Sequence, residues 1–179
     1  TDKKRVLALL GVTHIHTPGF VEEIKKRPDC VIKFVWDANP KLAEKIAAET
    51  GAKAVADIAQ ICDDKLVEAV VILSQTDRHR ELVLAAARAG KHLFVEKPLG
   101  ITGAESREMA DAIEKAGVLF TTGYFSRTDP KLLFLKEEIN KGRFGLITRV
   151  RASNCHGGAL AGWFDRPEWR WMTDPKQAG

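Results

Sequence analysis

The sequence has 179 residues, of which 45% are hydrophobic and 29% are charged, so neither a disordered nor a fibrous protein is expected. Its net charge is +4, and the basic residues are scattered without the basic block that a nucleic-acid groove needs. Three cysteines are too few for a disulfide scaffold, and no charged leader or membrane-spanning apolar run is found. We therefore expect a cytoplasmic protein with no membrane and no nucleic-acid partner.

Six short apolar runs have the continuous hydrophobicity of strands that are buried on both faces. They cover residues 5–10, 31–36, 53–56, 69–73, 92–96 and 118–122. Caps, first-turn prolines and closing glycines predict helices over residues 40–50, 79–89, 102–116 and 130–141. Strands that alternate with helices at this spacing indicate an α/β fold, in which a mostly parallel sheet carries helices on both faces.

The character of the chain changes after about residue 123. One more strand is predicted over residues 146–153, and a tryptophan-rich and glycine-rich segment without a clear period follows it. We therefore predict two units, a parallel-sheet domain over residues 1–123 and the incomplete start of a second domain over residues 124–179.

The loop after the first strand, "GVTHIHTPG", is a candidate cofactor loop, because ligands of open α/β sheets bind beyond the carboxyl ends of the strands. Gly11 fits the first position of the dinucleotide fingerprint, whereas Thr13 and His16 stand where the second and third glycines are expected. His14 and Ile15 lie between them and belong to the same candidate site. A plain strand-to-helix turn remains the alternative.

Asp37 ends the second predicted strand, where an acidic side chain can accept hydrogen bonds from an adenosine ribose. At about 4 Å and an effective dielectric of about 20, its carboxylate would repel a 2′-phosphate by about 4 kcal/mol per unit charge. NAD is therefore favoured over NADP, unless Asp37 is a surface acid that precedes a helix.

Two further strand ends carry polar groups. The loop after the fourth strand offers Ser74, Gln75, Thr76 and His79, which suit a ribose, although capping of the next helix explains the first three equally well. The fifth strand ends in Glu96 and Lys97, and the following proline keeps Lys97 out of the helical region. An ordinary surface ion pair is the alternative for these two residues.

Several segments together resemble the Gfo/Idh/MocA family of glucose-fructose oxidoreductase and inositol dehydrogenase. They are "VWDANPKLAEKIAAETGAK", "VVILSQTDRH", "AGKHLFVEKPLGIT" and "KGRFGLITRVRAS". The resemblance implies a Rossmann-type doubly wound parallel sheet followed by an α/β substrate domain that often forms oligomers. It also implies an NAD-dependent oxidoreductase, a dehydrogenase that moves a hydride between nicotinamide and a sugar or polyol. Lys97 would take part in proton transfer, and Glu96 would hold the ribose beside the nicotinamide.

The same resemblance limits what can be assigned. Family members are longer and carry an Asp-x-Gly-x-His segment with the principal acid-base residues, and this sequence ends before it. The resemblance places Tyr124, Arg127, Trp169 and Arg170 near the substrate cleft, although packing at a domain junction explains them equally well. A non-catalytic dinucleotide-binding module and an NAD-dependent glycosidase remain alternative functions. No metal is expected, because His14 and His16 have no third ligand of clear spacing.

Overall fold

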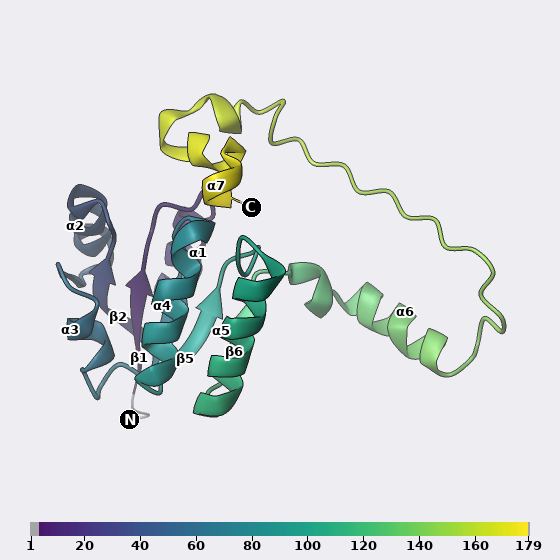
Figure 1. Ribbon diagram of the computed structural model, residues 1–179, viewed down its shortest axis with the longest axis horizontal. Helices are drawn as coiled ribbons and strands as arrows, with labels where there is room; N and C mark the ends of the chain where they lie inside the picture. Colours follow the sequence, from purple (N-terminus) through teal and green to yellow (C-terminus); the bar gives the residue numbers. More distant parts are fainter. Residues whose placement is uncertain (1–3, 179) are drawn as a thin grey trace.

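Six parallel strands form one sheet in the computed structural model, which describes residues 4–178 (Figure 1). Their order is β3-β2-β1-β4-β5-β6, so the first strand of the chain lies in the middle. This is the doubly wound order, in which the chain reverses direction across the sheet next to β1. The strands are β1 (Arg5–Leu10), β2 (Cys30–Trp36), β3 (Lys53–Ala54), β4 (Ala69–Ile72), β5 (His92–Val95) and β6 (Phe120–Thr122).

Helices follow the strands and cover both faces of the sheet (Figure 1). Between the strands lie α1 (Thr17–Lys25), α2 (Pro40–Thr50), α3 (Ala59–Cys62), α4 (Thr76–Arg88) and α5 (Gly103–Ala116). After β6 come the 3₁₀ helix η1 (Phe125–Thr128), α6 (Pro130–Asn140), the 3₁₀ helices η2 (Trp163–Asp165) and η3 (Pro167–Thr173), and α7 (Pro175–Ala178).

The two faces of the sheet bury two separate apolar clusters, because successive side chains of a strand point to opposite faces. Leu9 and Val71 pack with α1 and α2 on one face, while Leu10 and Ile72 pack with α4 and α5 on the other. Each such side chain stabilises the fold by about 1.5–3 kcal/mol when it is fully buried. Burial on both faces explains why the strands are continuous apolar runs rather than alternating ones.

The helix signals of the sequence act as expected. The side chain of Asn39 accepts a hydrogen bond from the Lys41 amide at the start of α2, and Thr102 does the same for the Glu105 amide at the start of α5. Gly51 and Gly117 close these helices in the left-handed conformation. The six predicted strands are confirmed to within two residues, and α4 begins at Thr76, three residues before its predicted start.

The strand that was predicted over residues 146–153 is wrong. These residues run as extended chain without a ladder partner in the part of the protein that the structure describes. Leu146 is 89% exposed and Val150 is 80% exposed, so neither side chain gains the packing that stabilises a strand. The division into two domains stays a prediction.

The C-terminal segment turns back toward the sheet after this extended stretch, and α7 lies against α4 (Figure 1). By contrast, α6 buries none of its side chains. Among the described residues, no helix is both long enough and apolar enough to cross a membrane.

Candidate functional site

The carboxyl ends of β2, β1, β4 and β5 lie side by side, because these strands are neighbours in a parallel sheet. The residues that follow them are Asp37, the loop from Gly11 to His16, Ser74 and Glu96. The fold therefore brings the four predicted strand-end segments to one edge of the sheet.

Gly11 is required where β1 leaves the sheet. Its φ angle is +77°, which residues other than glycine rarely adopt. A Cβ atom built there would lie 2.4 Å from the Cβ atom of Ser74. The Gly11 amide also donates a 2.7 Å hydrogen bond to the carbonyl oxygen of Trp36. The close contact between the ends of β1 and β4 therefore requires glycine at the first position of the dinucleotide fingerprint.

Asp37 is buried and holds the loop after β1. Its Oδ2 accepts hydrogen bonds from the Val12 amide at 2.7 Å and from the Thr13 hydroxyl at 3.0 Å, while Oδ1 accepts from the Asn39 amide at 2.8 Å. The hydroxyl of Thr13 is therefore directed to Asp37. The predicted contact of Asp37 with a ribose stays a prediction.

Two backbone amides of the same loop are free to bind a ligand. Neither the Thr13 amide nor the Ile15 amide makes a hydrogen bond with any residue that the structure describes, whereas the His14 amide donates to the Leu73 carbonyl oxygen. Helix α1 begins directly after the loop. Backbone amides that have no partner and lie beside a helix N-terminus commonly bind anions.

The candidate residues after β4 have different surroundings. Thr76 lines the cavity that is described below, and Gln75 lines a separate hollow. Ser74 is buried, and its hydroxyl donates to the Gln75 carbonyl oxygen at 3.1 Å. His79 is buried, with Nδ1 3.0 Å from the Pro98 carbonyl oxygen and Nε2 3.3 Å from the Ser74 carbonyl oxygen. His79 therefore joins the end of β4 to the segment after β5, and burial lowers its pKa.

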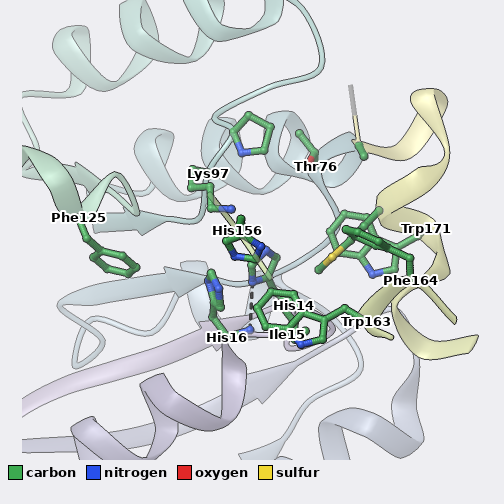
Figure 2. Close-up of a pocket in the computed structure, with 13 residues that line it drawn as sticks. His14, Ile15, His16, Thr76, Lys97, Phe125, His156, Trp163, Phe164 and Trp171 are labelled. Carbon is green, nitrogen blue, oxygen red and sulfur yellow. Dashed lines mark hydrogen bonds between the residues drawn. The ribbon is translucent and has the colours of Figure 1, made fainter. Parts of the chain in front are cut away.

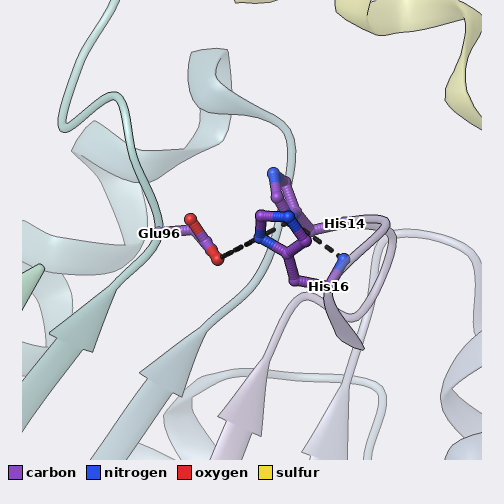
Figure 3. Close-up of side chains that lie close together, drawn as sticks. All are labelled: His14, His16 and Glu96. Atoms are coloured by element: carbon purple, nitrogen blue, oxygen red, sulfur yellow. Dashed lines mark hydrogen bonds and ion pairs between the residues drawn. The ribbon is translucent and has the colours of Figure 1, made fainter. Parts of the chain in front are cut away.

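His14, His16 and Glu96 form a compact cluster (Figure 3). Nδ1 of His16 lies 2.7 Å from Oε1 of Glu96, and Nδ1 of His14 lies 3.9 Å from the same oxygen. Burial alone would raise the pKa of Glu96, but hydrogen bonds from His16 and from the Lys97 amide outweigh it and lower that pKa. Burial lowers the pKa of His14 from 6.5 to about 4, so His14 is neutral at pH 7.

The same three side chains offer a set of metal-ligating atoms that lie within 4.8 Å of one another. The sequence spacing of His14 and His16 suggested no third ligand, whereas the fold supplies Glu96 from β5. The Nδ1 atoms already have partners, since Nδ1 of His16 bonds Glu96 and Nδ1 of His14 accepts from the His16 amide at 3.2 Å. A cation held through these two nitrogens would have to replace both hydrogen bonds.

A cavity of about 610 Å³ opens beside this cluster (Figure 2). Lys97 lies at this cavity, and the peptide bond between Lys97 and Pro98 is cis. Aromatic side chains from the C-terminal segment form much of the remaining wall. The lining residues are His14, Ile15, His16, Thr76, Lys97, Pro98, Phe125, His156, Trp163, Phe164, Trp171, Met172 and Ala178.

The predicted substrate residues do not line this cavity. Tyr124 is 43% exposed, and the guanidinium of Arg127 lies 5.7 Å from the centre of its ring. Trp169 stacks with Arg166, and Arg170 lines the separate hollow that also contains Gln75. The structure therefore brings none of the four to Lys97, and their substrate role stays a prediction.

Sequence reasoning missed several cavity residues, namely Phe125, His156, Trp163, Phe164, Trp171 and Met172. The tryptophan-rich run after residue 162 was a visible signal, but the chain has no period there that would assign one ring to the cavity and another to solvent. Nε1 of Trp171 is buried and lacks a hydrogen-bond partner among the described residues. Trp171 thus contributes an apolar ring to the cavity wall, while its indole nitrogen is enclosed by the protein.

Comparison with known proteins gives a consistent picture. Residues 6–124 match the GFO_IDH_MocA family model, described as an oxidoreductase family with an NAD-binding Rossmann fold. The chain is 34% identical over 154 residues to levoglucosan dehydrogenase of Pseudarthrobacter phenanthrenivorans, and 33% identical over 143 residues to myo-inositol 2-dehydrogenase of Thermotoga maritima. A solved structure of levoglucosan dehydrogenase in complex with NADH and levoglucosan has a TM-score of 0.70 at 29% identity.

These matches include most of this chain but less than half of each relative. The two curated relatives match 83% and 78% of the chain and 38% and 42% of their own lengths. The solved structure covers 80% of this chain, which covers 41% of that structure. The likeness is therefore to the nucleotide-binding half of these proteins and to the segment that follows it.

Proposed function

Because the chain belongs to the Gfo/Idh/MocA oxidoreductase family, with its NAD-binding Rossmann fold, we propose that it serves NAD-dependent oxidation or reduction at a CH–OH group of a sugar or polyol. The observation that carries this proposal is the position of Lys97 at a cavity that the candidate cofactor loop, His14 to His16, also lines. The similarity to sugar and inositol dehydrogenases supports the substrate class.

The residues at the strand ends fit a dinucleotide. Gly11 makes the tight turn, and the free amides of Thr13 and Ile15 beside α1 suit the pyrophosphate. Oδ1 of Asp37 accepts one hydrogen bond and has capacity for another, which a ribose hydroxyl can donate. A carboxylate at this place favours NAD over NADP, because it repels a 2′-phosphate.

Lys97, which lies two residues after β5, has a side chain that suits hydride transfer from an alcohol. When NAD⁺ is bound, its nicotinamide supplies the hydride acceptor. The ammonium group of Lys97 can stabilise the negative charge that develops on the alcohol oxygen as its proton leaves. The aromatic side chains of Trp163, Phe164 and Trp171 form part of the cavity wall. Apolar rings also suit the C–H faces of a sugar or polyol.

The proposal is tested by titrating NADH and NADPH into the chain and following binding by calorimetry. We expect NADH to bind more tightly than NADPH. A panel that contains myo-inositol and levoglucosan is then supplied with NAD⁺, and reduction of the cofactor is followed by absorbance. Failure of both dinucleotides to bind at millimolar concentration, with the circular dichroism of the fold intact, would overturn the proposal.

A further inference from the structure

Glu96 lies at the end of β5 but does not reach the cavity. Its side chain is 0% exposed, and it is absent from the cavity lining. Oε1 accepts from His16 at 2.7 Å, and Oε2 accepts from the Lys97 amide at 2.8 Å. Gly123 closes the far side, because a Cβ atom built there would lie 2.6 Å from Oε2. Both oxygens of Glu96 are therefore used inside the protein.

His16 contacts this carboxylate (Figure 3) and also lines the cavity, which Glu96 does not. Its side chain is 31% exposed and lines the cavity, while Nδ1 faces Glu96. An ionised carboxylate only accepts hydrogen bonds, so Nδ1 carries the proton, and in this tautomer of the imidazole the lone pair lies on Nε2. Nε2 makes no hydrogen bond with any residue that the structure describes.

We propose that His16 binds the cofactor directly and that Glu96 is a positioning residue that acts through it. Nε2 of His16 accepts a hydrogen bond from the nicotinamide half of the dinucleotide, either from a ribose hydroxyl or from the carboxamide. The inference rests on the proposed NAD binding. The family resemblance assigned the contact with the nicotinamide ribose to Glu96. We assign the contact with the nicotinamide half to His16, which is bonded to Glu96.

The position of His16 in the chain favours the cofactor over the substrate as its ligand. His16 is the N-cap of α1 and directly follows the free Ile15 amide, so it lies next to the expected pyrophosphate. It also shares the cavity with Lys97. A group that lies between the pyrophosphate and the reacting centre meets the nicotinamide ribose or its ring, and not the adenosine.

Two substitutions of His16 distinguish the proposed contact of Nε2 with the cofactor from the hydrogen bond between Nδ1 and Glu96. His16→Asn keeps an amide donor near the position of Nδ1, which can still bond Glu96, but it removes the acceptor at Nε2. His16→Gln places its carbonyl oxygen near the position of Nε2 and so keeps an acceptor. We expect His16→Asn to weaken NADH binding about fivefold to tenfold, as for one lost hydrogen bond, and His16→Gln to restore most of that loss.

Calorimetric titrations with NADH, ADP-ribose and ADP identify the group involved. ADP should bind wild type and both variants equally, because it lacks the nicotinamide half. A loss with NADH and with ADP-ribose assigns the contact to the ribose hydroxyls, and a loss with NADH alone assigns it to the carboxamide. Equal NADH affinity in wild type and His16→Asn would overturn the inference, as would an equal loss for ADP.

Two further outcomes are distinguishable from these. If wild type binds ADP but not NADH, the proposed function fails first, and the inference fails with it. If a chelator changes the NADH affinity of wild type but not that of His16→Asn, the cluster of His14, His16 and Glu96 holds a cation, and the inference is overturned in favour of a metal site. We expect the chelator to have no effect.

Discussion

Gly11 and Ser74 are in such close contact that a single methyl group at Gly11 would lie 2.4 Å from the Cβ atom of Ser74. The contact joins the end of β1 to the end of β4, on which the loop and the cavity both depend. We predict that Gly11→Ala lowers the free energy of unfolding by about 3 kcal/mol or more, because the strained φ angle and the overlap both act. Urea denaturation measures this change.

Gly51→Ala is the matched control for that substitution. Gly51 has a similar φ of +70°, but a Cβ atom there would meet nothing within 4 Å. We expect a loss of about 1 kcal/mol, which reports the backbone strain alone. Equal losses in the two variants would contradict the close contact with Ser74.

Asp37 is predicted to act on both stability and cofactor choice. Asp37→Ala leaves the Val12 amide without its 2.7 Å acceptor, and a buried donor without a partner costs about 1–3 kcal/mol. The same change removes the charge that repels a 2′-phosphate, so NADPH should gain affinity relative to NADH. Denaturation and titration of the two dinucleotides measure the two effects.

Asp57→Ala provides the control for Asp37. Oδ1 of Asp57 accepts from the Ala59 amide in the same way that Oδ1 of Asp37 accepts from the Asn39 amide, but Asp57 is exposed and accepts no hydrogen bond from the described residues of the loop after β1. We expect a loss of about 0.5–1 kcal/mol and an unchanged ratio of NADPH to NADH affinity. An Asp37→Ala protein with the same ratio as wild type would argue against a ribose contact.

Lys97→Met is predicted to affect turnover rather than binding. Loss of a positioned proton-transfer group lowers the rate by about 100-fold to 10,000-fold, whereas NADH affinity should remain within about threefold of wild type. The measurements are NAD-dependent substrate oxidation and NADH titration. Lys65→Met, in an exposed position before β4 and therefore at the opposite edge of the sheet, should change neither quantity. Unaltered turnover in Lys97→Met would remove Lys97 from the mechanism.

His14 should make the fold sensitive to mild acid. Its pKa is 6.5 in the unfolded chain and about 4 in the folded one, because burial disfavours the charged ring. The unfolded state therefore binds more protons between these values, and the free energy of unfolding decreases as pH falls from 6.5 toward 4, by up to about 3 kcal/mol. Above pH 6.5 this contribution to stability is complete.

The variant His14→Asn tests this contribution, because its side-chain oxygen can accept from the His16 amide without titrating. Denaturation at about pH 7 and about pH 5 should show a smaller loss in the variant than in wild type. His79, whose pKa is also lowered by burial, leaves a remaining loss in both proteins. Identical losses in the two proteins would contradict the buried, neutral state of His14.

The sequence predicted those features that follow from local chemistry. Apolar runs such as residues 5–10 and caps such as Asn39 and Thr102 have physical causes within a few residues, and the structure confirms these elements. The strand predicted over residues 146–153 is wrong because a strand also needs a partner, which a single segment cannot indicate. Apolar composition alone does not supply that partner.

The sequence predicted which residues lie at the strand ends, but not which of their side chains contact one another. Strand-end residues such as Asp37 and Lys97 were found from the rule for open parallel sheets. The bond between His16 and Glu96 was missed because it joins residues from two loops and depends on side-chain direction. Trp171 was missed for the same reason, since its neighbours Trp169 and Arg170 looked equally suitable in the sequence.

The central position of β1 has a consequence for synthesis of the chain on the ribosome. Leu7 pairs with Ile32 on one flank and with Ala69 on the other, so the second flank has no partner until β4 has emerged. Until then the nascent chain presents an open, apolar strand edge, which is the kind of surface that recruits chaperones or other nascent chains. Slower elongation through residues 40–68 would lengthen this exposure, and nascent-chain aggregation should rise with it.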